Sequence, residues 1–276
     1  MATESAFDGA CGRRIFTQSW LPEGVSRDQV VIAHGYAEHS GRYDAVARFL
    51  TARGFAVHAL DHHGHGRSEG ARAVIERFAH ADADIDALVD KVRGDGGQAT
   101  VKLIGHSMGG SLALNYALGH QDKLSGLVLS GPAIGGRLPT LQRWLLALVS
   151  AIAPRTGMIA LDANAVSRDL AVVAAYVADP LVFRGKVPAR TAHEMFAVIR
   201  SYPARVGALT VPCLLMHGDA DALVSAVDAA PVFAAIASPD KTVRIWPGLF
   251  HEIFNEPERA EVLVLTAHWL EAHPAR

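Results

Sequence analysis

The sequence predicts an α/β fold with a mostly parallel central sheet and helices on both of its faces. Short β-branched runs alternate with longer helical patterns, and several runs are apolar throughout, which is typical of strands covered on both sides. Half of the 276 residues are apolar, so the chain can bury a sizeable core. The predicted parallel strands are residues 30–33, 55–60, 101–104, 127–129, 213–216 and 243–246.

Further segments complete this pattern. We expect residues 14–20 to add an antiparallel strand at the edge of the sheet. The helix predicted over residues 78–92 places Asp82, Asp84 and Asp86 toward solvent and its apolar residues toward the sheet. The predicted core helices are residues 43–53, 78–92, 111–118 and 257–273, the last with Pro257 in its first turn.

A long segment separates the strand that ends at Leu129 from the next strand, which follows Val211. Its length of about eighty residues is too great for a loop without structure of its own. Prolines divide it into three helical patterns. We therefore predict one core interrupted by a cap, with core residues 1–131, cap residues 132–206 and core residues 207–276. The predicted cap helices are residues 141–153, 171–177 and 191–200.

Composition excludes several classes of protein. The net charge is −2 and no long basic run is present, so we expect no nucleic-acid partner. Cys11 and Cys213 could form one disulfide at most, which indicates a reducing compartment. The first residues lack the pattern of a secretory signal. The longest apolar stretch, residues 144–153, falls short of the ~20 residues that a membrane span needs. We expect a soluble, cytoplasmic protein.

The strongest functional motif is GHSMG at residues 105–109, with Gly110 after it. It follows a predicted strand and precedes a predicted helix, which is the context of a nucleophile elbow. In such an elbow a strained turn presents the serine hydroxyl at the end of the strand, and glycines allow the close turn. Ser107 is therefore the candidate nucleophile.

Serine is a weak nucleophile at neutral pH and needs a base that an acid orients. α/β-Hydrolases supply these partners in the chain order Ser, Asp, His. Here Asp219 and Asp221 follow the strand at 213–216, and His251 follows the next strand. We predict Asp221 as the acid and His251 as the base, with Asp219 as a turn residue that remains the alternative acid.

An ester hydrolase also needs two N–H groups that stabilise the oxyanion. One comes from the residue after the nucleophile, here Met108. The other comes from the loop after the first parallel strand, where Tyr36 is the candidate. No metal or cofactor is expected. His62, His63 and His65 lie close together in the sequence, as metal ligands often do. No cysteine lies beside them, however, and glycines break any helical spacing between them. We therefore expect a buried polar loop here.

Five segments of the chain carry a further set of motifs: HGYAEHSGRY at residues 34–43, DHHGHGRSEG at 61–70, GHSMGG at 105–110, DPLV at 179–182 and GLFHE at 248–252. Together they resemble the bacterial branch of the monoacylglycerol lipase family, in the α/β-hydrolase superfamily. The resemblance covers nearly the whole chain. One departure is His63, which stands where the family usually has arginine.

The resemblance implies an α/β-hydrolase fold with a helical cap. It also implies a serine hydrolase that cleaves monoacylglycerol to fatty acid and glycerol through an acyl-serine intermediate. Ser107, Asp221 and His251 match the family's triad, and Tyr36 and Met108 match its oxyanion positions. Glu38, Arg42 and Tyr176 fall where the family places polar residues around the glycerol head group.

Residues 141–153 are apolar almost all round. Either this helix lines an acyl tunnel and touches lipid surfaces with an exposed face, which we favour, or it simply packs on the core. The expected partners are therefore a monoacylglycerol or similar fatty-acyl ester and, transiently, a membrane surface. A broader carboxylesterase or lysophospholipase with the same triad is the alternative enzyme. A ligand-binding protein on a hydrolase scaffold is the alternative outside enzymes.

Overall fold

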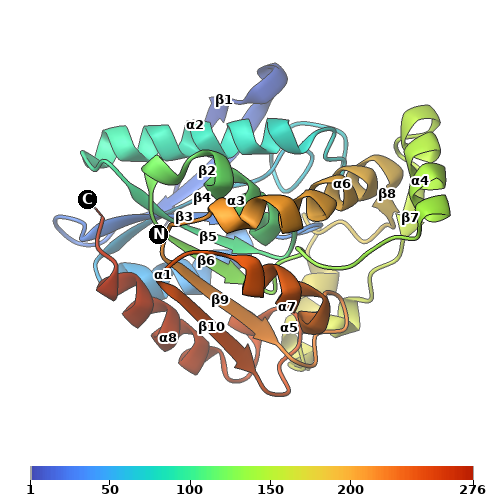
Figure 1. The fold of residues 1–276 in the computed structure, drawn as a ribbon. Helices are drawn as coiled ribbons and strands as arrows, with labels where there is room; N and C mark the ends of the chain where they lie inside the picture. The colour runs from blue at the N-terminus through green and yellow to red at the C-terminus, as the bar shows by residue number, and fades with distance from the viewer. Residues whose placement is uncertain (1, 276) are drawn as a thin grey trace.

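A computed structural model describes residues 2–275 and contains one eight-stranded sheet with helices on both faces (Figure 1). The strand order is β1-β2-β4-β3-β5-β6-β9-β10. Strands from β4 to β10 in this order run parallel, which confirms the predicted fold class. The strands are β1 (Thr3–Asp8), β2 (Arg14–Trp20), β3 (Asp28–Ala33), β4 (Phe55–Leu60), β5 (Val101–His106), β6 (Leu124–Ser130), β9 (Cys213–Gly218) and β10 (Lys241–Trp246).

The predicted strand at residues 14–20 is β2, and it runs antiparallel to β4 as expected. The prediction that it forms the sheet edge is wrong, because β1 pairs antiparallel along its outer side. Most side chains of β1 are exposed. A strand with little apolar surface to bury has no clear apolar alternation, so the sequence did not reveal it.

Helices cover both faces of the sheet and bury alternate residues of the same strands. One core cluster joins side chains of α2, α3, α6 and α7 to one face, for example Val31 and Leu103. A second cluster joins α1 and α8 to the other face, for example Ile32 and Ile104. The helices are α1 (Asp44–Thr51), α2 (Phe78–Gly96), α3 (Met108–Gly119), α4 (Thr140–Ile152), α5 (Leu170–Ala178), α6 (Ala189–Arg205), α7 (Ala226–Ala235) and α8 (Arg259–Ala272).

Some helix details differ from the prediction. The expectation that Asp84 faces solvent is wrong, because the turn before β2 lies over α2 and buries this residue. The Ala10 N–H in that turn donates to the carboxylate of Asp84 at 2.6 Å. Asp82 and Asp86 are partly buried. Pro257 precedes α8 rather than lying in its first turn. Helix α7 was not predicted, since Pro231 interrupts its apolar pattern.

The segment between β6 and β9 holds α4, α5, α6 and a short antiparallel pair, β7 (Gly157–Ile159) and β8 (Val187–Pro188). None of these elements joins the large sheet. The cap boundaries at residues 132 and 206 stay a prediction. Figure 1 shows α4 at the margin of the molecule, away from the sheet. Within residues 2–275, no helix has the length and apolar character needed to cross a membrane.

Hydrogen bonds at several points tie this segment to the core. The Phe183 N–H donates to the carbonyl of Ala37 at 2.8 Å, and the Glu252 N–H donates to the carbonyl of Val166 at 2.8 Å. The carboxylate of Asp179, in the DPLV segment, also lies 2.9 Å from His39 Nε2. These contacts bring α5 and the chain around it over the carboxyl ends of the parallel strands.

Candidate active site

Ser107 lies on the sharp turn between β5 and α3, with φ 54° and ψ −119°. This backbone conformation is strained for a residue with a Cβ and marks a nucleophile elbow. The turn needs glycines, because a Cβ on Gly109 would lie 2.2 Å from the Ala33 carbonyl oxygen. A Cβ on Gly105 would lie 2.5 Å from the Gly109 carbonyl oxygen. The motif therefore has the local structure that the sequence predicts.

Asp221 and His251 form a hydrogen-bonded pair beside this turn. His251 Nδ1 lies 2.7 Å from Asp221 Oδ2. An ionised carboxylate only accepts hydrogen bonds, so Nδ1 carries the proton and donates it. In the neutral ring, Nε2 is then the unprotonated atom. Ser107 and His251 line the same cavity.

The carboxylate of Asp221 is fixed by four donors. The N–H groups of Leu223 and Val224 donate to Oδ1, each at 2.9 Å. Oδ2 accepts from His251 and from Nε2 of His217, at 3.1 Å. Burial alone would raise the pKa of Asp221, but the hydrogen bonds from His217 and His251 outweigh it and hold this pKa well below its usual value.

His217 is a buried residue that the sequence analysis missed as part of the site. Its Nε2 faces two acceptors, Asp221 Oδ2 and the Val224 carbonyl oxygen at 2.9 Å, so this nitrogen carries the ring proton. His217 therefore donates to the same carboxylate oxygen as His251 and helps to orient the acid. The available signal was its position near the carboxyl end of β9, shortly before Asp221.

The electrostatics of His251 favour a base with a raised pKa. Burial would lower the pKa of His251, but the hydrogen bond and charge of Asp221, together with the charges of Glu252 and Glu38, raise it above its ordinary value. The ring of His106 lies against it, with centroids 4.7 Å apart. Burial lowers the pKa of His106 to about 3, so this neighbour stays neutral.

Asp219, the alternative acid, is placed differently. Its side chain is exposed, and Oδ1 accepts a hydrogen bond from the Gly248 N–H at 2.6 Å. It therefore stabilises the turn between β10 and His251, as an aspartate in a turn commonly does. The structure brings Asp221, and not Asp219, into contact with the histidine.

The loop after β3 lies across the cavity from this pair. Gly35, Tyr36 and Glu38 line the cavity together with Ser107. The Gly35 N–H donates to Glu38 Oε1 at 2.6 Å, which fixes the backbone just before Tyr36. Met108 is the first residue of α3, so its N–H belongs to the set that a helix leaves without intrahelical acceptors.

Glu38, Arg42 and Tyr176 come together in one network that also contains Glu252. Arg42 donates to Glu38 at 2.7 Å and to both oxygens of Glu252, at 2.6 and 2.7 Å. Its guanidinium carbon lies 4.7 Å from the ring centre of Tyr176. Tyr43 Oη also donates to Glu38, at 2.7 Å. Burial would lower the pKa of Arg42, but the charges of Glu252 and Glu38 raise it well above its ordinary value.

Only some residues of this network line the main cavity. Glu38, Tyr176 and Glu252 line the main cavity, whereas Arg42 lies behind them and lines a small neighbouring cavity. Glu252 was missed as a site residue, although it follows His251 directly in the sequence. The head-group role of Glu38, Arg42 and Tyr176 stays a prediction.

The main cavity has a volume of about 400 Å³, within the usual range for small-molecule sites. Ser107 and His251 lie in its wall, and most of the remaining lining comes from the segment between β6 and β9. This part of the wall is largely apolar. Its apolar side chains include Ile159, Leu161, Val166, Phe183, Met195, Phe196 and Ile199.

The histidine-rich loop at residues 62–65 is buried under the site, as predicted. The His62 N–H donates to His34 Nε2 at 2.9 Å, and His65 Nδ1 lies 3.2 Å from the His63 carbonyl oxygen. His63, which replaces the usual arginine, faces the buried carboxylate of Asp84 with Nδ1 at 3.4 Å. The histidine that stands in place of the family's usual arginine therefore lies next to a buried acidic residue of α2.

Comparisons with known proteins identify the family to which the chain belongs. The family model described as Serine aminopeptidase, S33, matches residues 24–258. The chain is 41% identical over 274 residues to the monoacylglycerol lipase of Mycolicibacterium smegmatis, covering 98% of each chain. It is 31% identical over 250 residues to the monoglyceride lipase of Homo sapiens, covering 90% of this chain and 82% of the human protein.

A solved structure supports the same assignment. The monoacylglycerol lipase of Paleococcus ferrophilus matches with a TM-score of 0.82 and 29% identity, covering 99% of both chains. The expectation of a hydrolase related to monoacylglycerol lipases is therefore confirmed. The chain belongs to the serine aminopeptidase S33 family, with the α/β-hydrolase fold that its motifs predicted.

Proposed function

We propose that this chain hydrolyses monoacylglycerols to a fatty acid and glycerol through an acyl-serine intermediate, with Ser107, His251 and Asp221 as its triad. The observation that carries the proposal is that His251, which is hydrogen-bonded to Asp221, lines the same largely apolar cavity as the strained Ser107. A relative 41% identical over almost the whole chain is named a monoacylglycerol lipase, which supports this substrate.

The first half of the reaction forms the acyl-serine. His251 Nε2 accepts the proton of the Ser107 hydroxyl as its oxygen attacks the ester carbonyl carbon. Asp221 holds the Nδ1–H tautomer and stabilises the imidazolium. The N–H groups of Tyr36 and Met108 donate to the oxyanion, and the positive end of α3 adds to this stabilisation. His251 then returns the proton to the glycerol oxygen, and glycerol leaves.

The second half releases the acid. His251 accepts a proton from water, and the resulting hydroxide oxygen attacks the acyl carbon. The C–O bond to Ser107 breaks and the serine oxygen regains the proton. The hydrophobic wall from the segment between β6 and β9 holds the acyl chain during both halves. The polar side chains of Glu38 and Tyr176, which Arg42 connects, face the glycerol hydroxyls.

We also propose that α4 binds transiently to lipid surfaces and that the protein works in the cytoplasm. Leu146 and Ser150 are the buried residues of α4, whereas Trp144 is 71% exposed and Ile152 is 74% exposed. An exposed apolar helix face of this kind can insert at the boundary of a lipid layer. No residue of α4 lines the cavity that holds Ser107, so the expectation that this helix lines the acyl tunnel is wrong. Binding through α4 would instead hold the protein at the layer that contains the acyl ester.

A hydrolysis panel tests the proposed substrate. Monoacyl-, diacyl- and triacylglycerols are compared with lysophospholipid and with p-nitrophenyl esters of matched acyl length, and kcat/KM is measured for each. We expect the highest kcat/KM for monoacylglycerol, because one chain fills the cavity and the head group is small and neutral. A clear preference for lysophospholipid or for short soluble esters would contradict the proposal and support the alternative enzyme classes.

A further inference from the structure

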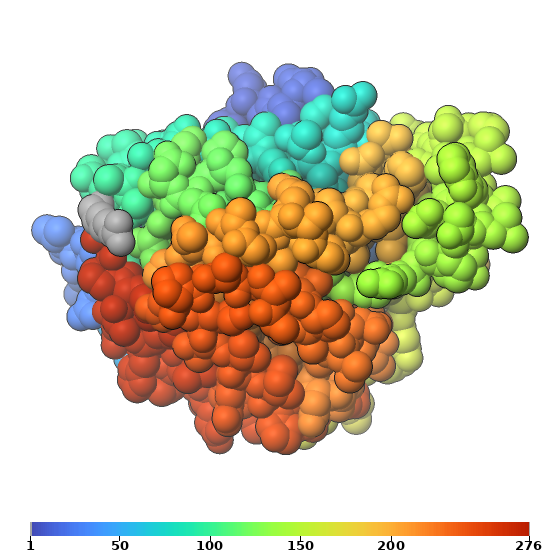
Figure 2. Space-filling model, viewed as in Figure 1, coloured from blue at the N-terminus to red at the C-terminus, as the bar shows by residue number. Residues whose placement is uncertain are grey.

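A second cavity lies beside the acyl cavity and has a volume of about 430 Å³. It lies between α6, α7 and the segment that leads from β6 into α4, and Figure 2 shows the surface hollowed between α6 and that segment. Three arginines line it: Arg137, Arg143 and Arg200. One acidic side chain, Asp228, also lies in the lining.

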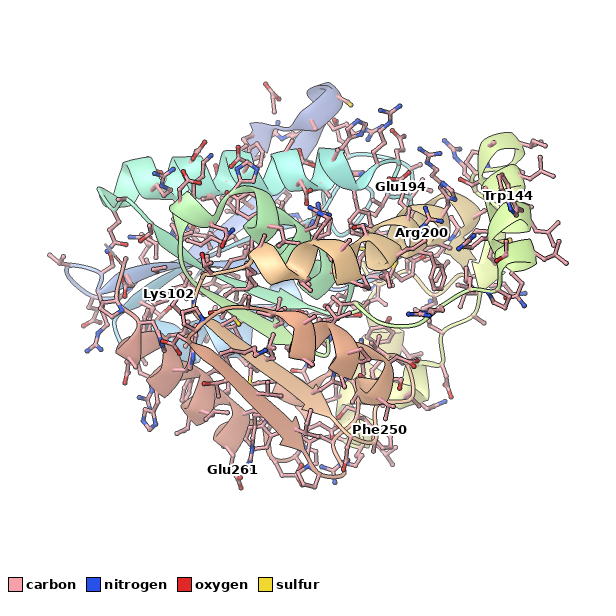
Figure 3. The ribbon with its side chains drawn as sticks, viewed as in Figure 1. Lys102, Trp144, Glu194, Arg200, Phe250 and Glu261 are labelled. Carbon is pink, nitrogen blue, oxygen red and sulfur yellow. The ribbon has the colours of Figure 1, made fainter. Side chains whose placement is uncertain are left out.

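These three arginines differ from most arginines nearby. Within residues 2–275, none of the three guanidinium groups has an ion-paired or hydrogen-bonded partner. On the same helix as Arg200, Arg190 lies 3.1 Å from Glu194, and Arg205 donates to Asn115 at 2.7 Å. Figure 3 labels Arg200 on α6 and Trp144 on α4, at the end of the molecule where both helices lie. The three arginines outnumber the one acidic residue of the lining, Asp228, so the cavity carries net positive charge.

The rest of the lining is largely apolar and includes Leu138 and Val232. Phe196, Ile199 and Asp228 line both cavities, as do Gly135 and Gly136. The two cavities therefore share one wall. An apolar floor with a cationic rim suits a single-chain amphiphile that has an anionic head.

The proposed reaction produces such a molecule from a neutral one. Ester and water give a carboxylate, a proton and glycerol, and carboxyl groups with pKa values of about 4 are ionised at pH 7. A cationic cavity therefore distinguishes product from substrate by charge. We propose that Arg137, Arg143 and Arg200 form an exit site that binds the carboxylate of the released fatty acid. This inference rests on the proposed function for the identity of that acid.

An anionic lipid head group offers similar chemistry from a different source. The shared wall residues Phe196 and Ile199 favour the free acid, because they place the cavity with the arginines directly beside the space where the acyl chain is released. A head group held in a lipid layer needs no such proximity. Binding experiments can separate the two sources.

Titration calorimetry with decanoate and decanol tests the exit site. The two probes share a chain length and differ in charge. Both are titrated into the Ser107→Ala protein and into the same protein with Arg137→Gln, Arg143→Gln and Arg200→Gln. A matched control carries Arg14→Gln, Arg77→Gln and Arg155→Gln, which are exposed arginines outside the cavity.

We expect the cavity variant to bind decanoate about tenfold more weakly, which corresponds to ~1.4 kcal/mol. Decanol binding should change less than about twofold, because a neutral head has no charge interaction to lose. The control should bind both probes as the parent does, and added salt should weaken only decanoate binding in the parent. Unchanged decanoate affinity in the cavity variant, or an equal loss for decanol, would overturn the exit site.

Binding to vesicles that contain phosphatidylglycerol tests the alternative ligand, an anionic lipid head group. If the cavity variant loses binding to these vesicles and keeps its decanoate affinity, the arginines bind lipid head groups and the exit site is wrong. Failure of the proposed function would look different. The wild-type chain would then fail to hydrolyse monoacylglycerol, while arginine-dependent decanoate binding would still establish a carboxylate site.

Discussion

Nδ1 of His251 lies 2.7 Å from Oδ2 of Asp221, whereas Asp219 bonds only to the nearby turn. Asp221→Asn should therefore lower kcat by about 10⁴-fold, since an amide no longer favours the Nδ1–H tautomer or the imidazolium. Asp219→Asn should cost less than about tenfold. Steady-state hydrolysis of a soluble p-nitrophenyl ester measures both variants. Equal losses, or a larger loss for Asp219→Asn, would show that the acid is misassigned.

His217 should act as a positioning residue through Asp221. His217→Leu removes the donor at 3.1 Å and should lower kcat about 10- to 100-fold with little change in KM. His217→Gln supplies a side-chain N–H in its place and should recover a large part of the rate. A purely structural role would instead lower the melting temperature of both variants and leave them with the same loss of kcat.

The acid limb of the pH–rate profile should report His251. Its base function needs the neutral ring, and its pKa is raised, so kcat/KM should fall as pH drops through a value above 6.5. Glu252 stabilises the protonated ring by its charge, so Glu252→Gln should lower this pKa. The acid limb should then move to lower pH.

Glu261→Gln is the matched control for this shift. Glu261 is exposed on α8 and lies outside the cavity, as Figure 3 illustrates by its position at the surface. Its profile should coincide with that of the wild-type protein. An acid limb that stays in place in Glu252→Gln, or that moves to higher pH, would contradict the electrostatic account of His251.

The exposed face of α4 should contribute to lipid binding more than to catalysis. Leu145→Ser with Leu148→Ser removes two side chains that are more than half exposed. Each inserted leucine contributes roughly 1.5–3 kcal/mol, so vesicle binding should weaken at least about tenfold in a sedimentation assay. Hydrolysis of a short soluble ester should change much less.

Leu21→Ser provides the control, because Leu21 is also exposed but lies in the loop after β2. It should bind vesicles as the wild-type protein does. Unchanged vesicle binding in the α4 variant would show that the helix face serves packing rather than lipid contact.

The sequence predicted the elements whose residues carry a strong local pattern. The parallel strands are buried on both faces and read as apolar runs, and the elbow glycines are dictated by backbone contacts, so β5, Ser107 and α3 were all found. Exposed β1 and proline-containing α7 lacked such patterns. The predicted pairing of Asp221 with His251 rested on chain order and resemblance.

Long-range contacts set the features that the sequence could not supply. Nothing local indicates that Asp84 is buried, because its partner at Ala10 lies far away in the chain. Arg200 of the second cavity lies on α6, far in the chain from Arg137 and Arg143, and only the fold brings it to them. The role of His217 likewise depends on where its ring lies relative to Asp221.

Two measurements on the same protein test whether Ser107 is the nucleophile. The first is labelling by a fluorophosphonate probe, and the second is the rate of monoacylglycerol hydrolysis. We expect the folded wild-type protein to be labelled on Ser107 and to hydrolyse monoacylglycerol. Ser107→Ala should take up no label and lose nearly all turnover, with an unchanged melting temperature. Labelling at another residue, or substantial hydrolysis by folded Ser107→Ala, would contradict Ser107 as the nucleophile.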